Sequence, residues 1–265
     1  MAAQVSLIVD TLEGTIDRVE IALERIRTFE PEEGYYVAFS GGKDSQVVLD
    51  LVERSGVQFD AHMNLTTVDP PELLRFVREH YGDRVTLERP DTSMYKLIVK
   101  KRIPPTRKVR YCCDHLKERG GAGRRVVTGI RWAESARRAK RGMTESCFRD
   151  KTRVFVHPII DWSDDEVWEY LNGRSLPHCS LYDEGKKRIG CVMCPFNNKH
   201  MQEDAKRWPK FAAMYERACV ASYDKAIADG LERKTWKDGH EMYEWWISGK
   251  TFDHDGEDRL FPLDN

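Results

Sequence analysis

The sequence has no uninterrupted apolar run of about 18 residues and no signal-peptide pattern, so we expect a cytoplasmic protein without a membrane-spanning segment. It has no internal repeat or low-complexity tract, which argues against solenoids and fibrous proteins. The formal net charge of −1 gives no global sign of a nucleic-acid partner. Seven cysteines in an intracellular chain of 265 residues are typical of thiols or metal ligands rather than of disulfides.

A glycine-containing loop at residues 40–45 lacks the spacing of two common phosphate-binding patterns, Gly-x-x-x-x-Gly-Lys-Ser/Thr and Gly-x-Gly-x-x-Gly. It follows a strand-forming run, Tyr35 to Phe39, and leads into a helical pattern. Adjacent glycines let backbone N–H groups converge, and the positive end of the helix dipole favours an anion there. A lysine charge and two serine hydroxyls add donors, so the loop is predicted to bind phosphate. The loop consists of Ser40, Gly41, Gly42, Lys43, Asp44 and Ser45.

Strand-forming and helix-forming segments alternate from this loop onward, which predicts an α/β fold with a doubly wound parallel sheet and ligands at the carboxyl ends of its strands. Asp69-Pro70-Pro71-Glu72 is a helix-capping signal, so a capping role and a metal or nucleotide role for Asp69 both stay open. A second capping box begins at Ser163. The expected strands are residues 59–64, 85–88, 126–128 and 154–156, and the expected helices after the loop helix are 69–81, 94–101 and 163–171.

Both ends of the chain are predicted to be helical. Apolar residues at helical spacing from Val5 to Arg27 indicate an amphipathic helix, and the aromatic-rich stretch from Glu203 to Gly249 indicates helices that pack on the main domain. We therefore expect three parts: an N-terminal helix (residues 1–30), a nucleotide-binding domain that includes the cysteine site (31–200) and a helical C-terminal extension (201–265).

The segment from Lys96 to Arg141 is strongly basic, with 16 Lys or Arg residues against 3 acids. Such a segment can steer a polyanion, so we expect it to meet a nucleic-acid acceptor. Aromatic residues are sparse within it, so the sequence indicates no base-reading module. Most single arginines of such a run are simply solvated, but Arg131 and Arg137 differ because they follow a strand end at helical spacing.

The order of several motifs between Tyr35 and Pro195 resembles the phosphoadenosine phosphosulfate (PAPS) reductase family, within the PP-loop ATP pyrophosphatase superfamily. The resemblance implies the adenine-nucleotide α-hydrolase fold, with ATP and Mg²⁺ at the loop and Lys43, Asp44 and Ser45 as catalytic residues. The motifs are Ser40–Ser45, Thr66–Glu72, Arg110–Cys113, Thr128–Ser135, Pro158–Ser163 and Gly190–Pro195. The further nucleotide-binding residues that the resemblance implies are Thr67, Asp69, Gly129, Arg131, Glu134, Ser135 and Arg137.

Cys191-x-x-Cys194 by itself fits zinc, an iron–sulfur centre or a redox pair. Together with the vicinal pair Cys112-Cys113 it resembles the ligand set of iron–sulfur sulfonucleotide reductases. That resemblance implies a four-iron four-sulfur cluster, with Zn²⁺ as the alternative. Cys179 is an alternative ligand, which would leave one of the vicinal cysteines free or one iron open.

Two departures from those reductases decide the functional hypothesis. Reductases attack with the cysteine of a Glu-Cys-Gly-x-His tail, whereas no cysteine follows Cys219 here. Reductases also tend to carry a degraded glycine loop, and Ser40–Ser45 is intact. The chain thus looks most similar to the pyrophosphatase components of DNA phosphorothioation and thiolation systems, which implies adenylation of an acceptor and a sulfur-donor protein as partner. The alternatives are a PAPS or adenylyl-sulfate reductase that uses a partner's thiol, and a non-catalytic nucleotide- or nucleic-acid-binding subunit with a structural metal.

Overall fold

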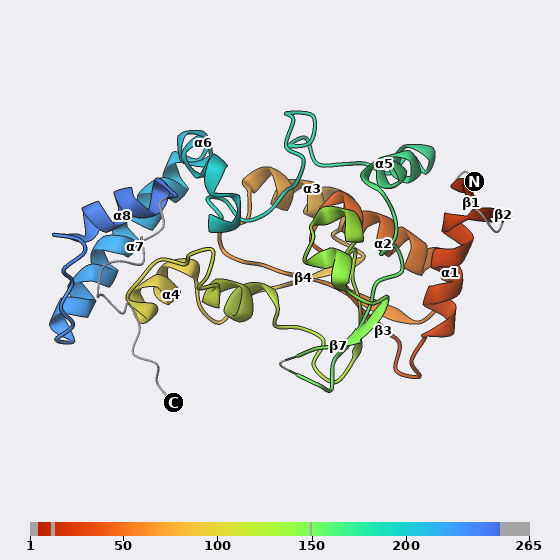
Figure 1. Cartoon of the computed structure of the whole chain (residues 1–265), viewed down its shortest axis with the longest axis horizontal. Helices are drawn as coiled ribbons and strands as arrows, with labels where there is room; N and C mark the ends of the chain where they lie inside the picture. The colour runs from red at the N-terminus through yellow and green to blue at the C-terminus, as the bar shows by residue number, and fades with distance from the viewer. Residues whose placement is uncertain (1–4, 12–13, 149, 250–265) are drawn as a thin grey trace. The chain divides into compact units, whose positions relative to one another are not determined.

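A six-stranded sheet forms the centre of the first of two units in the computed structural model, which describes residues 5–11, 14–148 and 150–249 (Figure 1). The strand order is β5-β4-β3-β6-β8-β7, and all neighbours are parallel except β7, which pairs antiparallel with β8 at one edge. The strands are β3 (Tyr35–Ala38), β4 (Phe59–Asn64), β5 (Val85–Glu88), β6 (Arg125–Val127), β7 (Thr144–Ser146) and β8 (Val154–Val156).

The chain builds this sheet outward in two directions from β3. It passes from β3 to β4 and β5 on one side and then returns to β6 and β8 on the other, so the order reverses between β3 and β6. In open α/β sheets ligands bind at the carboxyl ends of the strands at such a switch point. The predicted doubly wound α/β fold is confirmed, and the loop Ser40–Ser45 follows β3 at that point.

In the described ranges, the α-helices of the first unit are α1 (Arg18–Thr28), α2 (Lys43–Ser55), α3 (Pro71–Tyr81) and α5 (Asp164–Gly173). The apolar positions that predicted α2 are buried: Val47, Val48, Leu51 and Val52. Helix α5 begins with the predicted capping box, in which Ser163 Oγ accepts from the backbone N–H of Glu166 and the Glu166 carboxylate accepts from the backbone N–H of Ser163. The predicted N-cap at Asp69 would start the helix at Pro70, but helix α3 begins one residue later, at Pro71.

The predicted N-terminal helix is wrong over its first half. Strands β1 (Ile8–Thr11) and β2 (Gly14–Asp17) pair antiparallel, and the helix begins only at Arg18. Gly14 has a φ of +125°, which a helix cannot contain, and β-branched side chains on either side favour extended backbone. Asp17 then caps α1, because its carboxylate accepts from the backbone N–H of Val19 at 2.9 Å.

The second unit is mainly helical and contains the cysteine motifs. Its α-helices among the described residues are α4 (Met94–Lys101), α6 (Met201–Arg207), α7 (Pro209–Ala228) and α8 (Gly239–Ile247), with α7 packed against α4 and α8. Aromatic side chains fill this packing: Tyr215 and Trp246 have ring centroids 4.7 Å apart, and Trp246 Nε1 donates to the carbonyl of Pro105 at 2.6 Å. The helical C-terminal stretch is thus confirmed as far as residue 249, and residues 250–265 lie outside the described part.

The helices of the described ranges are too short or too polar to cross a lipid bilayer.

Candidate functional site

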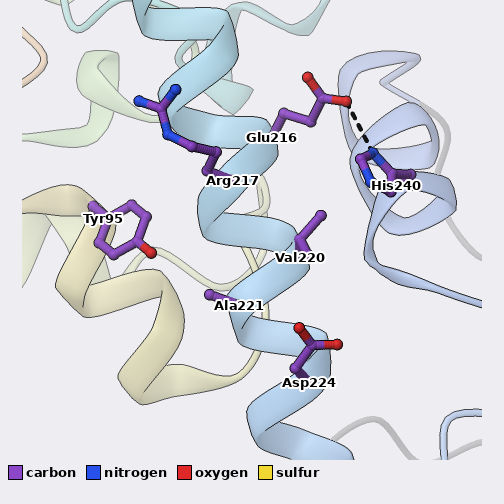
Figure 2. Close-up of a pocket in the computed structure, with 7 residues that line it drawn as sticks. All are labelled: Tyr95, Glu216, Arg217, Val220, Ala221, Asp224 and His240. Carbon is purple, nitrogen blue, oxygen red and sulfur yellow. Dashed lines mark hydrogen bonds and ion pairs between the residues drawn. The ribbon is translucent and has the colours of Figure 1, made fainter.

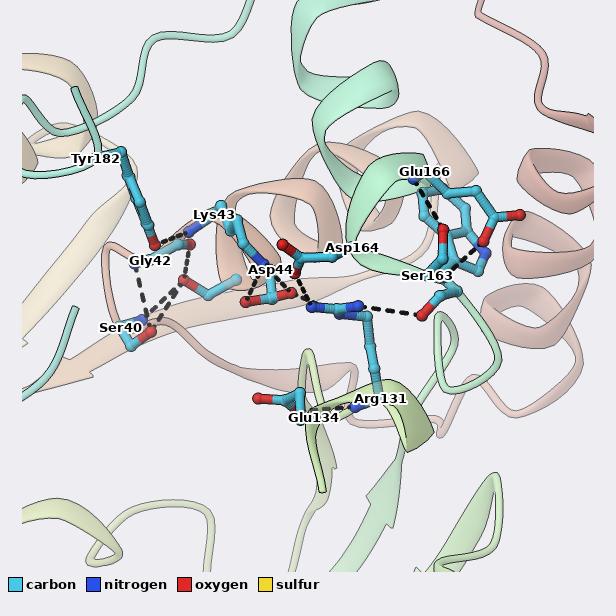
Figure 3. Close-up of polar contacts among 12 residues, drawn as sticks. Ser40, Gly42, Lys43, Asp44, Arg131, Glu134, Ser163, Asp164, Glu166 and Tyr182 are labelled. Atoms are coloured by element: carbon cyan, nitrogen blue, oxygen red, sulfur yellow. Dashed lines mark hydrogen bonds and ion pairs between the residues drawn. The ribbon is translucent and has the colours of Figure 1, made fainter. Parts of the chain in front are cut away.

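The loop Ser40–Ser45 connects the end of β3 to the start of α2 in a tight turn (Figure 3). Gly41 has a φ of +72°, and a Cβ there would come within 2.7 Å of Val77 and 2.8 Å of Leu73, both on α3. Only glycine fits this position, so the backbone can bend sharply against α3. The turn brings the N-terminal amides of α2, a 13-residue helix, to the carboxyl edge of the sheet, where they favour an anion.

Serine hydroxyls and a tyrosine hydroxyl hold the loop in this shape. Ser45 Oγ donates to the carbonyl of Gly42 at 2.8 Å and accepts from the backbone N–H of Ser40 at 3.2 Å. Tyr182 Oη accepts from the backbone N–H of Lys43, the first amide of α2, at 2.9 Å. The tyrosine oxygen therefore lies where an oxygen of a bound phosphate would accept the same N–H.

Two cations and two carboxylates form a closed network at the start of α2. Lys43 Nζ lies 2.6 Å from Asp164 Oδ1 and 3.2 Å from Asp44 Oδ1. Arg131 reaches the same carboxylates, with Nε 2.6 Å from Asp44 and Nη2 2.8 Å from Asp164. The cationic side chains are nearly inaccessible, at 4% exposure for Lys43 and 2% for Arg131. Figure 3 shows Asp164 between the lysine and the arginine.

The pKa values follow from this pairing. Burial alone would raise the pKa of the Asp164 carboxyl, but the hydrogen bonds and charges of Lys43 and Arg131 hold it below its ordinary value. Burial would lower the pKa of Arg131, and Asp44 and Asp164 raise it instead. Asp164 and Arg131 therefore stay charged at neutral pH, as their pairing requires.

Asp164 and Tyr182 were missed by sequence reasoning. Asp164 is the first residue of α5, where the capping box gave it a sufficient structural role. Tyr182 follows the loop helix by well over a hundred residues, and no local pattern marks it.

The remaining residues predicted near Arg131 have separate roles. Gly129, two residues after β6, lies so close to α2 that a Cβ would come within 2.9 Å of the Asp44 backbone. Glu134 accepts from the backbone N–H of Arg131 at 3.0 Å. Ser135 and Arg137 are exposed; Ser135 Oγ accepts from the backbone N–H of Arg138 at 3.3 Å.

Thr67 and Asp69 belong to the second unit, where they order a turn. Both carboxylate oxygens of Asp69 accept from Thr66, at 2.7 Å from its backbone N–H and 2.8 Å from its hydroxyl. Burial raises the pKa of Asp69, although these hydrogen bonds oppose the shift. Thr67 has a φ of +64°, and its Oγ1 accepts from the backbone N–H of Met94 at 3.0 Å.

Four of the predicted ligand cysteines lie in this second unit and influence one another. The hydrogen bond from the Cys112 thiol lowers the pKa of Cys113 to about 6 against the effect of burial, and Arg110 Nη2 also donates to Cys113 Sγ at 3.3 Å. The same hydrogen bond and burial raise the pKa of Cys112, and the charges of Cys191 and Cys194 raise it further.

An all-thiol donor set without histidine fits an iron–sulfur cluster or zinc. Burial raises the pKa of Cys191 to about 11, which favours the neutral thiol at that position, whereas Cys113 is the more acidic thiol. Across the described ranges, no three Cys, His, Asp or Glu side chains already converge as a metal-binding group. Cys179 lies in the first unit, fully buried, and burial raises its pKa.

Each unit also has a surface pocket. The one in the second unit lies along α7 and is lined by residues of α4, α7 and α8 (Figure 2). Its lining includes one hydrogen-bonded pair, His240 Nδ1 with Glu216 Oε1 at 3.0 Å. The pocket of the first unit adjoins the loop and is lined by Asp164, Trp168, Tyr182, Gly185, Lys186 and Lys187.

Comparisons with known proteins find sequence relatives of this chain. A family model described as phosphoadenosine phosphosulfate reductase domain matches residues 34–197. An uncharacterized protein of Methanocaldococcus jannaschii is 33% identical over 226 residues, or 77% of this chain, and the match covers about half of that protein (47%). An adenosine 5'-phosphosulfate reductase of Staphylococcus haemolyticus is 28% identical over 223 residues, or 77% of this chain and 87% of that protein.

Among solved structures, a phosphoadenylyl-sulfate reductase from Candida auris in a phosphate complex has the same fold. It aligns with a TM-score of 0.50 at 17% identity, over 72% of this chain and 99% of that chain.

Proposed function

Since the chain belongs to the phosphoadenosine phosphosulfate reductase family, we propose that it binds ATP at Ser40–Ser45 and splits it into AMP and pyrophosphate while adenylating an acceptor for sulfur transfer. The observation that carries the proposal is the intact loop at the start of α2, where the backbone N–H of Lys43 donates to Tyr182 and its ammonium donates to Asp164. A polyphosphate needs both donors, because its charge is spread over several oxygens.

The four-charge network supplies these donors by exchanging partners. When a polyphosphate enters, its oxygens take the Lys43 ammonium and the first amide of α2, which frees the Asp44 and Asp164 carboxylates on the side that faced Lys43 while Arg131 stays bonded to them. Carboxylate oxygens are the ligands that Mg²⁺ prefers, so the released pair would hold the ion that accompanies ATP. Mg²⁺, when bound, supplies charge neutralisation on the departing pyrophosphate.

Arg131 holds the two carboxylates in place during this exchange. Its guanidinium is buried and donates to the carbonyl of Trp162 at 3.1 Å, so it stays in place whichever partner the carboxylates take. It thereby positions Asp44 and Asp164 beside Lys43 rather than contacting the nucleotide itself.

The proposed cofactor is a four-iron four-sulfur cluster held by Cys112, Cys113, Cys191 and Cys194, with Zn²⁺ as the alternative for the same ligands. Support comes from the all-thiol donor set and from the low pKa of Cys113, because thiolates are the binding form. A bound cluster would supply redox or electrostatic chemistry, and no part of the proposed ATP reaction depends on it.

A second candidate is reduction of a sulfonucleotide with a thiol from a partner protein. The observation that favours it is the similarity to an adenosine 5'-phosphosulfate reductase over 87% of that protein. The same loop would then hold the anionic end of the sulfonucleotide.

Two assays on anaerobically purified protein separate the candidates. Pyrophosphate release from ATP with Mg²⁺, in the presence of single-stranded nucleic acid and a sulfur donor, supports the pyrophosphatase. Sulfite release from adenylyl sulfate or PAPS with added thiol, and no pyrophosphate release from ATP, would support the reductase and defeat the first proposal.

A further inference from the structure

Trp132 is a large aromatic side chain that lies on the surface of the first unit, at 43% exposure. Two hydrogen bonds nevertheless hold it in place. Its backbone N–H donates to the carbonyl of Ile160 at 2.7 Å, and its indole Nε1 donates to the carbonyl of Arg141 at 2.8 Å. The indole is therefore an ordered aromatic surface that faces solvent. Aromatic surfaces of this kind bind nucleic-acid bases by stacking, without strong sequence preference.

This tryptophan lies at the same edge of the sheet as the glycine loop. It directly follows Arg131, whose guanidinium binds the Asp44 carboxylate at the start of α2. Arg131 comes shortly after the end of β6, and Ile160 comes shortly after the end of β8. Because both strands run parallel to β3, their carboxyl ends meet at the edge that carries Ser40–Ser45. A ligand on the indole would thus lie at the edge where the nucleotide is proposed to bind.

The acids in the segment from Trp132 to β7 are already paired. Glu134 forms an ion pair with Arg138, and Glu145 forms one with Arg141 at 2.6 Å. Each of these carboxylates has a cation of its own, so neither opposes the approach of an anion to the indole. The charge of this surface is therefore set by the cations that remain.

Two such cations stand beside the tryptophan. Within the described ranges, the side chains of Arg137 and Lys140 are exposed and form no ion pair or hydrogen bond. Lys140 ends the 3₁₀ turn η3 (Arg138–Lys140), which packs against the turn η2 that begins at Trp132. The surface thus combines an ordered ring with unpaired positive charge, which suits a base and its flanking phosphate.

We propose that Trp132 and the turn beside it bind a single-stranded nucleic acid, with one base against the indole and a flanking phosphate at Lys140. Arg137 adds to the positive field that attracts the strand. The inference deepens the proposed function and rests on it in one respect, since the bound strand is taken to be the acceptor. Binding of the strand does not itself depend on ATP cleavage, so the two proposals can fail separately.

The test is a fluorescence-anisotropy titration of the full chain with a short labelled single-stranded oligodeoxynucleotide, without ATP. Trp132→Ala should weaken binding roughly tenfold, because base stacking is lost. Trp132→Phe also loses the hydrogen bond to Arg141 but keeps an aromatic ring, so its affinity should stay within about threefold of the wild type. This pair of variants separates stacking from a structural role of the indole.

Lys140→Ala should weaken binding and lower the slope of log affinity against log salt concentration by about 0.7, because one phosphate contact is lost. Arg78→Ala is the matched control. It removes an exposed cation in the last turn of α3, which precedes the start of β5 at the amino edge of the sheet. Both the affinity and the salt dependence should be unchanged in this control.

The proposal is overturned if the wild-type chain does not bind the oligonucleotide, or if either Trp132→Ala or Lys140→Ala binds it with wild-type affinity. Equal losses in Trp132→Phe and Trp132→Ala, or an equal loss in Arg78→Ala, would also overturn it. So would displacement of the strand by polyglutamate as effectively as by unlabelled strand. Strand binding by a chain that releases no pyrophosphate would leave this inference standing and remove the proposed reaction, whereas pyrophosphate release without strand binding would do the reverse.

Discussion

The carboxylate of Asp164 lies 2.6 Å from the ammonium of Lys43, although 121 positions separate the two residues in the sequence. The contact joins the start of α5 to the start of α2, so two helix N-termini and their side chains meet at one edge of the sheet. Because Arg131 binds the same carboxylate, the three residues act as a unit, and changes to any of them have connected effects.

Lys43→Ala should abolish pyrophosphate release and leave the fold intact. The variant loses the charge that faces the phosphates, and Arg131 keeps its bonds to both carboxylates. The measurement is pyrophosphate release at saturating ATP, with circular dichroism as the check on folding and Lys151→Ala as the control. Wild-type release by Lys43→Ala would show that the loop is not the reaction site.

Arg131→Lys should lower both stability and ATP affinity. Lysine keeps one charge but cannot reach Asp44, Asp164 and the Trp162 carbonyl together as the guanidinium does. We expect a loss of about 1–3 kcal/mol in the free energy of unfolding, since buried charged hydrogen bonds are broken. Urea denaturation and equilibrium ATP binding measure the two effects, and Arg137→Lys, at an exposed position, is the control. A variant with unchanged stability would contradict the role given to Arg131.

Tyr182→Phe should bind pyrophosphate more tightly than the wild type. The hydroxyl competes with a phosphate oxygen for the backbone N–H of Lys43, and phenylalanine keeps the ring while removing the competitor. The gain should be about 1 kcal/mol, the net value of one hydrogen bond. Isothermal titration calorimetry with pyrophosphate and Mg²⁺ gives the affinity. Weaker binding would mean that the hydroxyl assists the ligand rather than competing with it.

Asp161 should make the stability of the first unit depend on pH in the acidic range. Burial would raise the pKa of Asp161, but hydrogen bonds from Arg25 at 2.7 and 3.0 Å and the charge of Arg18 lower it. A folded-state pKa below the unfolded value of about 3.9 stabilises the fold above that pH. The stabilisation is lost as the pH falls through the folded-state pKa.

Asp161→Asn should therefore unfold more easily at neutral pH, by about 1–3 kcal/mol, and differ less from the wild type as the pH approaches 3. Urea denaturation at several pH values checks both statements. Asp165→Asn, at an exposed position on α5, is the control. A stability difference that grows on acidification would have the wrong sign and would refute the assignment.

Cys194→Ser should remove the metal centre. Anaerobically purified wild-type chain is expected to be brown and to contain about four irons and four sulfides, whereas the variant should be colourless. The Cys147→Ser variant, outside the ligand set, should keep the colour. A wild-type chain that contains one zinc and no sulfide would show that the metal is a structural zinc rather than an iron–sulfur cluster.

The loop could be predicted from the sequence because its determinants are local. Strand β3, two glycines and the apolar face of α2 lie within about twenty residues, and the capping box at Ser163 is equally local. Asp164 and Tyr182 contact the loop only because the fold brings distant parts of the chain together, so no sequence spacing predicts these contacts. At the N-terminus the apolar residues fit a helix and a hairpin almost equally well, and Gly14 with the Asp17 cap decides for the hairpin.

The closed network has a consequence for ligand discrimination. Both cations already have carboxylate partners and almost no exposure to solvent, so a small monovalent anion would have to break the short ion pairs of Lys43 before it could bind there. Breaking a charge-assisted hydrogen bond costs about 1–3 kcal/mol, which a weakly bound chloride or acetate does not offset. A polyphosphate that arrives with a divalent cation replaces both halves of the network at once. The site should therefore bind a metal-bound nucleotide in preference to the small monovalent anions that surround it.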